Sequence, residues 1–218
     1  MVIFMALNLH KFVFSPFMEN TYVIWDNETN ESAIIDPGCY ETNEEIELEK
    51  FIEEKNLQVK YLINTHCHID HVFGNAFVKE KYLPIFLAPE EDIFLLHNAV
   101  EQGKMFAIDV KPSPEPDEFI YDGMSIKLGN IKNEFLFTPG HTPGEYCIYF
   151  EYDKICITGD VLFREGIGRT DLWGGDTKTL LNSIRTRLFT LPDDVVIYPG
   201  HGEESTIGHE KTNNPFLA

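Results

Sequence analysis

The run Thr65-His-Cys-His-Ile-Asp-His71 restricts the possible folds of this 218-residue chain more than any other segment. It follows an apolar run at 59–64, which is typical of a buried strand, and precedes a helical pattern at 72–82, so it lies on a strand-to-helix loop. In an extended stretch its first two histidines point to the same side, while its last two residues can turn toward a second position. So many nitrogen and oxygen donors on one loop need a ligand that neutralises and orders them, and a divalent metal ion does this. The run therefore predicts a metal site beside the end of a strand.

Three further residues stand in a comparable setting. A glycine comes directly before His141, Asp160 and His201, and each of the three follows a strand-like run. Glycine permits the sharp turn that aims the next side chain inward. The recurrence of this setting argues against ordinary surface or core histidines. The predicted metal ligands are His66, His68, Asp70, His71, His141, Asp160 and His201.

Four other residues receive a structural interpretation. His10, His97 and His209 lack a glycine-framed strand end, so we expect them to be structural or to face solvent. Cys67 alternates to the opposite side of the loop from its two histidine neighbours. We expect it to be a small packed residue rather than a metal ligand.

Arg169 and Asp171, in the segment Gly168-Arg-Thr-Asp171, admit two interpretations. They can hold the metal ligands in place, because such ligands need hydrogen-bonded partners. They can equally form a buried ion pair that fixes the loop after Asp160. The sequence does not decide between the two.

The charge balance excludes several classes of partner. Lys and Arg number 17 against 36 Asp and Glu, which gives a formal net charge of -19. Phosphate binding needs clustered basic residues, so we expect neither nucleic acid nor an anionic membrane surface as a partner. The apolar segment Met1–Leu7 is far shorter than the ~20 residues of a membrane span. Four scattered cysteines without a Cys-x-x-Cys pair suit reduced thiols, so we expect a cytoplasmic protein.

Strand-like and helical patterns alternate through both halves of the chain, and we expect one domain spanning residues 1–218. The predicted strands are 7–14, 21–25, 33–35, 59–64, 84–88, 119–121, 125–128, 134–138, 146–151, 154–158 and 195–198. The predicted helices are 41–55, 72–82, 89–100 and 177–188, and the Pro-rich segment 111–117 is predicted to be an exposed loop.

On these residues the chain resembles the metallo-β-lactamase superfamily, whose ordered ligand motifs match it from about residue 60 through residue 201. The resemblance implies an αββα sandwich, in which two mixed β-sheets are flanked by helices and the metals lie at one edge between the sheets. It also implies a division of the ligands. His66, His68 and His141 would bind the first metal, Asp70, His71 and His201 the second, and Asp160 would bridge the two.

Within the superfamily, the segments 138–144 and 159–171 are most similar to the glyoxalase II (hydroxyacylglutathione hydrolase) group and its shorter relatives. This implies hydrolysis of a small-molecule thioester by hydroxide on two divalent ions, zinc above all, with iron or manganese as alternatives. Asp70 would orient the water and accept its proton. Members that act on glutathione thioesters carry a basic C-terminal helical extension, whereas this chain ends soon after His201, so we expect a short form.

Two other activities remain open at this point. The segments Thr65–His68 and Gly168–Asp171 also resemble the persulfide dioxygenases, which would need a single Fe(II) on His66, His141 and Asp160. A non-hydrolytic di-iron redox protein, similar to the flavodiiron proteins, is the weaker alternative, because no flavin-binding domain follows. The thioester hydrolase and the persulfide dioxygenase would share ligands and differ in the number of metal ions.

Overall fold

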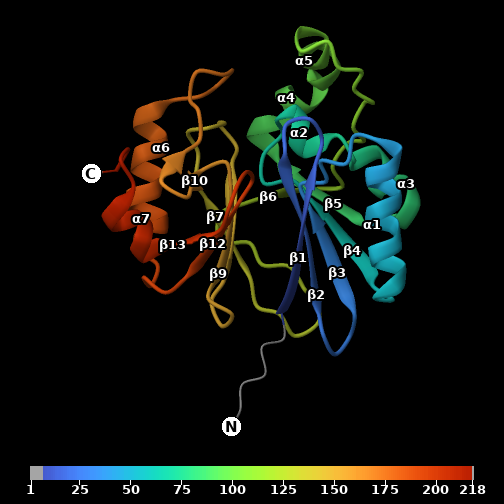
Figure 1. Ribbon diagram of the computed structural model, residues 1–218, viewed down its shortest axis with the longest axis horizontal. Coiled ribbons are helices and arrows are strands. Elements are labelled where there is room, and N and C mark those ends of the chain that lie inside the picture. Colours follow the sequence, from blue (N-terminus) through green and yellow to red (C-terminus); the bar gives the residue numbers. More distant parts are fainter. Residues whose placement is uncertain (1–6, 218) are drawn as a thin grey trace.

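Two β-sheets lie face to face in the computed structural model, which describes residues 7–217 (Figure 1). The first sheet runs in the order β1-β2-β3-β4-β5-β6 and is mixed, because its first two pairs are antiparallel and the other three are parallel. Its strands are β1 (Leu7–Phe14), β2 (Glu19–Asp26), β3 (Glu31–Ile35), β4 (Gln58–Ile63), β5 (Ile85–Pro89) and β6 (Glu118–Ile120).

The second sheet runs in the order β13-β12-β9-β8-β7 and is also mixed, since β12 and β9 are parallel and the other neighbours antiparallel. Its strands are β7 (Glu134–Phe137), β8 (Tyr146–Phe150), β9 (Ile155–Gly159), β12 (Val196–Pro199) and β13 (Ser205–Thr206). A small antiparallel hairpin, β10 (Leu162–Phe163) and β11 (Gly166–Ile167), follows β9.

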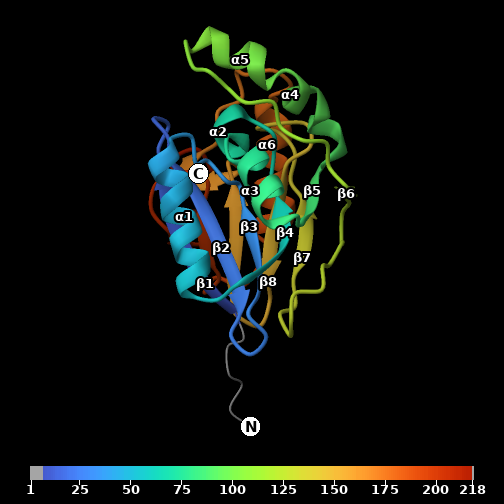
Figure 2. The same ribbon diagram turned by 90° about the vertical axis from the view of Figure 1, so that its right-hand side faces the viewer.

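Helices cover the outer face of each sheet and one end of the molecule (Figures 1 and 2). The first sheet carries α1 (Thr42–Glu54) and α3 (Asn75–Tyr82). The second carries α6 (Thr177–Ser183), its π-helical continuation (Ile184–Leu188) and α7 (Ile207–Asn213). Four short helical elements lie at the end where the strands lead into the longer loops: α2 (Ile69–Val72), a 3-10 turn (Glu90–Asp92), α4 (Ile93–His97) and α5 (Ala99–Met105).

Alternation along the strands builds the layers. In β2, Val23 packs against the outer helices, whereas its neighbours Tyr22 and Ile24 pack between the two sheets. On α1, Leu48 and Ile52 lie one turn apart and are buried against the first sheet, which leaves the acidic residues facing solvent. Three buried clusters therefore separate four layers. The expected αββα sandwich is confirmed.

One predicted strand is wrong. Residues 125–128 form no strand, although Ile126 and Leu128 are buried between the sheets. The backbone N–H of Ile126 donates to the side chain of Asn133 at 2.9 Å, and the Asn133 amide donates back to the Ile126 carbonyl at 2.9 Å. A side chain thus takes the place of a neighbouring strand.

Two predicted helices are interrupted. The pattern at 72–82 is divided between α2 and α3 at Gly74, whose N–H donates to the Pro37 carbonyl at 2.7 Å and whose Cβ, if present, would lie 2.3 Å from Cys39 Sγ. The pattern at 89–100 is divided by Asn98 into α4 and α5, and α5 continues to Met105. These breaks depend on tertiary contacts that helical periodicity does not contain.

The short elements β10, β11, β13 and α7 were not predicted, because each is too short to show periodicity. Of the apolar segment Met1–Leu7, residues 1–6 lie outside the described part of the chain. None of the helices that the structure describes is long and apolar enough to cross a bilayer.

Candidate metal centre

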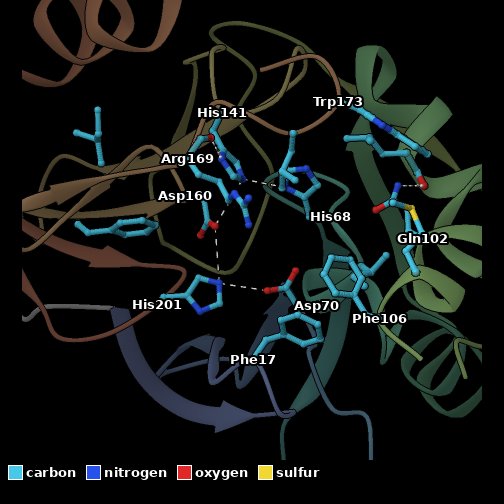
Figure 3. Close-up of a pocket in the computed structure, with 16 residues that line it drawn as sticks. Phe17, His68, Asp70, Gln102, Phe106, His141, Asp160, Arg169, Trp173 and His201 are labelled. Carbon is cyan, nitrogen blue, oxygen red and sulfur yellow. Dashed lines mark hydrogen bonds and ion pairs between the residues drawn. The ribbon is translucent and has the colours of Figure 1, made fainter. Parts of the chain in front are cut away.

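The seven predicted ligands meet at one edge of the sandwich, between the ends of the two sheets. Figure 3 shows five of them: His68, Asp70, His141, Asp160 and His201. The first four come from the loop after β4 and the start of α2. His141 follows β7, Asp160 follows β9, and His201 follows β12. Strands that end at the same edge thus bring together segments far apart in the sequence.

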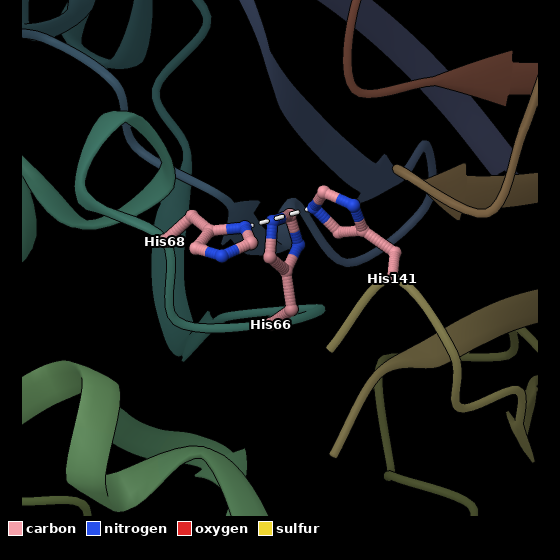
Figure 4. Close-up of side chains that lie close together, drawn as sticks. All are labelled: His66, His68 and His141. Atoms are coloured by element: carbon pink, nitrogen blue, oxygen red, sulfur yellow. Dashed lines mark hydrogen bonds between the residues drawn. The ribbon is translucent and has the colours of Figure 1, made fainter. Parts of the chain in front are cut away.

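Three histidines form the first group. His66, His68 and His141 are buried, and one ring nitrogen of each lies within 4.8 Å of the others (Figure 4). His68 Nδ1 and His141 Nε2 are only 2.8 Å apart. Two nitrogen lone pairs approach so closely only when a proton or a cation lies between them.

Asp70, His71 and His201 form the second group, again with ligand atoms within 4.8 Å of one another. His201 Nε2 lies 3.2 Å from Asp70 Oδ2, and His71 Nε2 lies 3.9 Å from the same oxygen.

Asp160 lies between the two groups. Its Oδ2 is 3.5 Å from His141 Nε2 in the first group and 3.7 Å from His201 Nε2 in the second. Its Oδ1 is 3.5 Å from His71 Nε2. A carboxylate in this position can bind two ions at once.

The outer nitrogens of four of the five histidines face protein oxygens. These contacts join His66 Nδ1 to Thr65 Oγ1 (3.1 Å), His71 Nδ1 to Asp36 Oδ2 (3.2 Å), His141 Nδ1 to the Arg169 carbonyl (2.6 Å) and His201 Nδ1 to the Met18 carbonyl (3.2 Å). Metal-binding histidines are held in this way, because the outer contact fixes the ring and leaves the inner nitrogen free.

The inner atoms are left without partners. His66 Nε2, His71 Nε2 and Asp160 Oδ1 are buried and have no hydrogen-bond partner among the described residues. A buried polar atom without a partner costs about 1–3 kcal/mol, so their convergence calls for a ligand. Imidazole and carboxylate donors in these numbers fit divalent zinc, iron or manganese.

Burial sets the protonation of the first group. It lowers the pKa of His66 well below its usual range, that of His68 to about 3 and that of His141 to about 4. All three imidazoles are therefore neutral at pH 7 and offer lone pairs.

In the second group the pKa values of the histidines shift in the opposite direction. Burial acts to lower the pKa of His71, but the carboxylates of Asp70, Asp160 and Asp36 outweigh it and hold that pKa well above its usual value. Burial acts in the same direction on His201, where the hydrogen bond to Asp70 prevails and raises the pKa. A metal ion that binds this group must displace protons.

Asp36 belongs to the site and was not predicted. It directly follows β3 and has a φ of +48°, and its carboxylate oxygens accept hydrogen bonds from the Thr65 N–H (2.7 Å) and Oγ1 (2.6 Å). Because both oxygens are engaged, we interpret Asp36 as a support for His71 rather than as a ligand. Asp36 shares the strand-end position of the ligands, but Ile35 rather than a glycine precedes it, so the glycine criterion did not find it.

Glu145 is a second unpredicted neighbour. The carboxylate Oε1 accepts a hydrogen bond from the Asp160 N–H at 2.6 Å and lies 3.5 Å from His66 Nδ1. The side chain is fully buried, and burial raises its pKa well above the usual range. Sequence reasoning had no signal for Glu145 beyond its position four residues after His141.

The glycines before the ligands have different roles. Gly140 and Gly159 have positive φ values of +138° and +48°, as expected for sharp turns. Gly200 has no positive φ, so the turn argument is wrong at this position. Glycine is needed there because a side chain would not fit. A Cβ at Gly200 would lie 2.2 Å from Asp160 Oδ1.

The structure resolves the two interpretations of Arg169 and Asp171 in an unexpected way. Arg169 contacts a predicted ligand through its backbone carbonyl, not its guanidinium. The guanidinium forms two 2.8 Å hydrogen bonds with Asp171. Both side chains are exposed, so the interpretation as a buried ion pair is wrong.

The remaining candidates lie outside the group. His10 stacks on Phe51 with ring centroids 4.3 Å apart, His97 contacts Glu115, and His209 contacts Glu165. Cys67 is buried in the core between the first sheet and its helices.

A cleft of about 440 Å³ opens onto the metal group. Five of the predicted ligands line it: His68, Asp70, His141, Asp160 and His201. The other lining residues are mostly apolar and come from both halves of the chain: Phe17, Ile69, Leu95, Gln102, Met105, Phe106, Phe163, Ile167, Arg169, Leu172 and Trp173.

The fold and the site define the class of protein. The family model of the metallo-beta-lactamase superfamily matches residues 15–201. The chain belongs to this superfamily.

Relatives of differing activity accompany this match. The chain is 42% identical to hydroxyacylglutathione hydrolase GloC of Haemophilus influenzae, over 97% of this chain and 98% of that protein. It is 34% identical to the human mitochondrial persulfide dioxygenase ETHE1, over 90% of this chain and 70% of that protein. Among solved structures it is similar to TTHA1623 in a di-iron-bound form, with a TM-score of 0.86 and 31% identity over 95% of this chain and 100% of that one.

Proposed function

We propose that this protein is a metal-dependent hydrolase of small-molecule thioesters that uses two divalent metal ions. The observation that carries the proposal is the position of Asp160, whose carboxylate lies within 3.7 Å of histidines from both groups. Zinc is the metal we expect, with iron or manganese as alternatives. In this assignment His66, His68 and His141 would hold one ion, Asp70, His71 and His201 would hold the other, and Asp160 would contact both.

A divalent ion supplies hydroxide at neutral pH, because it lowers the pKa of bound water from 15.7 to about 7. The chain's own residues place the reactants. Asp70 lines the cleft with its Oδ2 3.2 Å from His201, where it can orient the attacking water and accept its proton. The thiol released from a thioester has a pKa near 8.5, so it leaves as a thiolate without a separate acid.

A persulfide dioxygenase is the second candidate, supported by the relative at 34% identity. It would need one Fe(II) on His66, His141 and Asp160, and His141 Nε2 lies 3.5 Å from Asp160 Oδ2. That reaction leaves the second group, Asp70, His71 and His201, without a part. We therefore prefer hydrolysis over this alternative.

Metal content and two assays on the same preparation test the proposal. Protein loaded with zinc should contain about two ions per chain and hydrolyse S-lactoylglutathione or a neutral lactoyl thioester. Protein loaded with iron is assayed in parallel for oxygen consumption with a low-molecular-weight persulfide. One iron per chain with persulfide-dependent oxygen consumption, and no thioester hydrolysis with either metal, would contradict the proposal.

A further inference from the structure

The cleft beside the metal group is lined chiefly by apolar side chains, and several of them remain open to water. Met105 is 71% exposed, Phe106 is 50% exposed and Trp173 is 50% exposed, although all three are large and apolar. The rings of Phe17 and Phe106 contact edge to face with centroids 5.8 Å apart, and Figure 3 shows both on the Asp70 side of the cleft. Apolar surface that stays exposed beside a reactive centre is typical of a ligand site.

The C-terminal end of helix α5 presents three of these cleft residues, which we call the α5 face. Gln102 and Met105 lie in the helix and Phe106 is its C-cap; Met105 and Phe106 follow Gln102 by three and four residues, so both can lie beside its side chain. Gln102 is only 8% exposed, and its amide nitrogen lies 3.5 Å from the Leu95 carbonyl, at the limit of a hydrogen bond. Because this bond is long and Gln102 lines the cleft, its amide can exchange the bond for one to a polar group of a ligand.

Basic side chains beside the cleft are paired with carboxylates. Apart from histidines, Arg169 is the basic residue among the described lining residues, and Asp171 binds its guanidinium through two hydrogen bonds. Two cations that are chain neighbours of lining residues also pair with carboxylates: Lys104 with Glu101 at 2.6 Å, and Arg164 with Glu203 at 2.6 Å. An anionic ligand arm would have to compete with these carboxylates.

We propose that the α5 face formed by Gln102, Met105 and Phe106, together with Phe17, binds an uncharged and mainly apolar arm of the substrate. The inference rests on the proposed function, because the arm belongs to the thioester whose carbonyl lies at the metal group. The apolar arm can be the acyl chain or the thiol substituent, since both are attached to the reacting carbonyl. The binding energy then comes from methylene groups rather than from carboxylates.

Two series of neutral thioesters distinguish whether the apolar arm is the acyl chain or the thiol substituent. In one series the acyl chain grows from acetyl to octanoyl on N-acetylcysteamine, and in the other the acetyl group is kept while an alkanethiol grows. With the zinc-loaded protein we expect kcat/KM to rise about twofold to fourfold per methylene in one series, the upper value corresponding to full burial. A flat response in both series, or a thousandfold preference for the same acyl group on glutathione, would overturn the inference.

Binding without turnover gives an independent readout. Calorimetry with S-hexyl-N-acetylcysteamine, a thioether that cannot be hydrolysed, should show binding that Phe106→Ala weakens about three- to tenfold. Phe94→Ala is the matched control, because Phe94 is 40% exposed on α4 and lies outside the residues that line the cleft. Equal binding to wild type and Phe106→Ala would refute the inference.

The same measurements distinguish this inference from the proposed function. Thioether binding that strengthens with chain length, without hydrolysis of any thioester, would contradict the proposed function and support the apolar site. Thioester hydrolysis whose kcat/KM does not change with chain length or with Phe106→Ala would support the proposed function and contradict the apolar site.

Discussion

Replacing Gly200 by alanine adds one methyl group at the centre of the proposed dinuclear site. The new Cβ would lie 2.2 Å from Asp160 Oδ1 and 2.7 Å from His71 Cε1. Non-bonded atoms settle near 3.5 Å, so the carboxylate must retreat by about 1 Å. The Asp160 backbone cannot follow freely, because Glu145 binds its N–H at 2.6 Å.

A displacement of this size is large for a metal ligand, since ligand distances hold to within about 0.2 Å. Loss of a mere supporting partner typically costs 10–100-fold in metal affinity. We therefore expect Gly200→Ala to weaken zinc binding at least 100-fold, through the loss of the bridging contact.

Competition with a chromophoric chelator measures this affinity, and elemental analysis after dialysis measures the retained metal. Gly166→Ala is the matched control, because a Cβ there meets its nearest neighbour, Phe163 Cβ, at an ordinary 3.5 Å beside the same cleft. Thermal unfolding of both metal-free variants shows that they are folded. A folded Gly200→Ala protein that keeps two zinc ions with wild-type affinity would refute the assignment of Asp160.

Further expectations follow from the same geometry. Asp160→Ala should reduce the rate of thioester hydrolysis more than 100-fold, whereas Asp171→Ala should reduce it less than tenfold, because Asp171 is exposed and hydrogen-bonds Arg169. Steady-state kinetics of the two variants measures both losses, and equal losses would contradict this expectation. His10→Ala, His97→Ala and His209→Ala should leave the metal stoichiometry unchanged, and the loss of one equivalent from any folded variant would show that the ligands are wrongly sorted. Metal binding should release protons and strengthen as pH rises from 6 to 8, since carboxylates hold the pKa of the second group's histidines above the usual value. Calorimetry in buffers of different ionisation enthalpy measures the release, and binding independent of buffer and pH would refute it.

The sequence located the site because its ligands sit at strand ends. His66, His68 and the glycine-framed His141, Asp160 and His201 could be found locally, since each follows a strand that ends in a recognisable turn. Parallel strands then bring such ends to one edge. The long strands and α1 were predictable for a similar reason, because their hydrophobic periodicity extends over several residues.

What the sequence did not reveal depends on tertiary contacts. Asp36 supports His71 from another strand, and Glu145 holds the Asp160 backbone from a neighbouring loop. The need for glycine at position 200 arises from the packing of Asp160 and has no local signature. The apolar face of α5 likewise becomes a cleft wall only through its position beside the metal group.

The number of metal ions bound per chain tests the central claim most directly. Zinc titration of the metal-free wild-type protein, followed by native mass spectrometry, counts the ions on each molecule. Two groups of ligands joined by Asp160 predict two zinc ions per chain, and one at most in folded Asp160→Ala under the same conditions. A wild-type protein that saturates with a single ion, or an Asp160→Ala protein that still binds two with unchanged affinity, would contradict the dinuclear site.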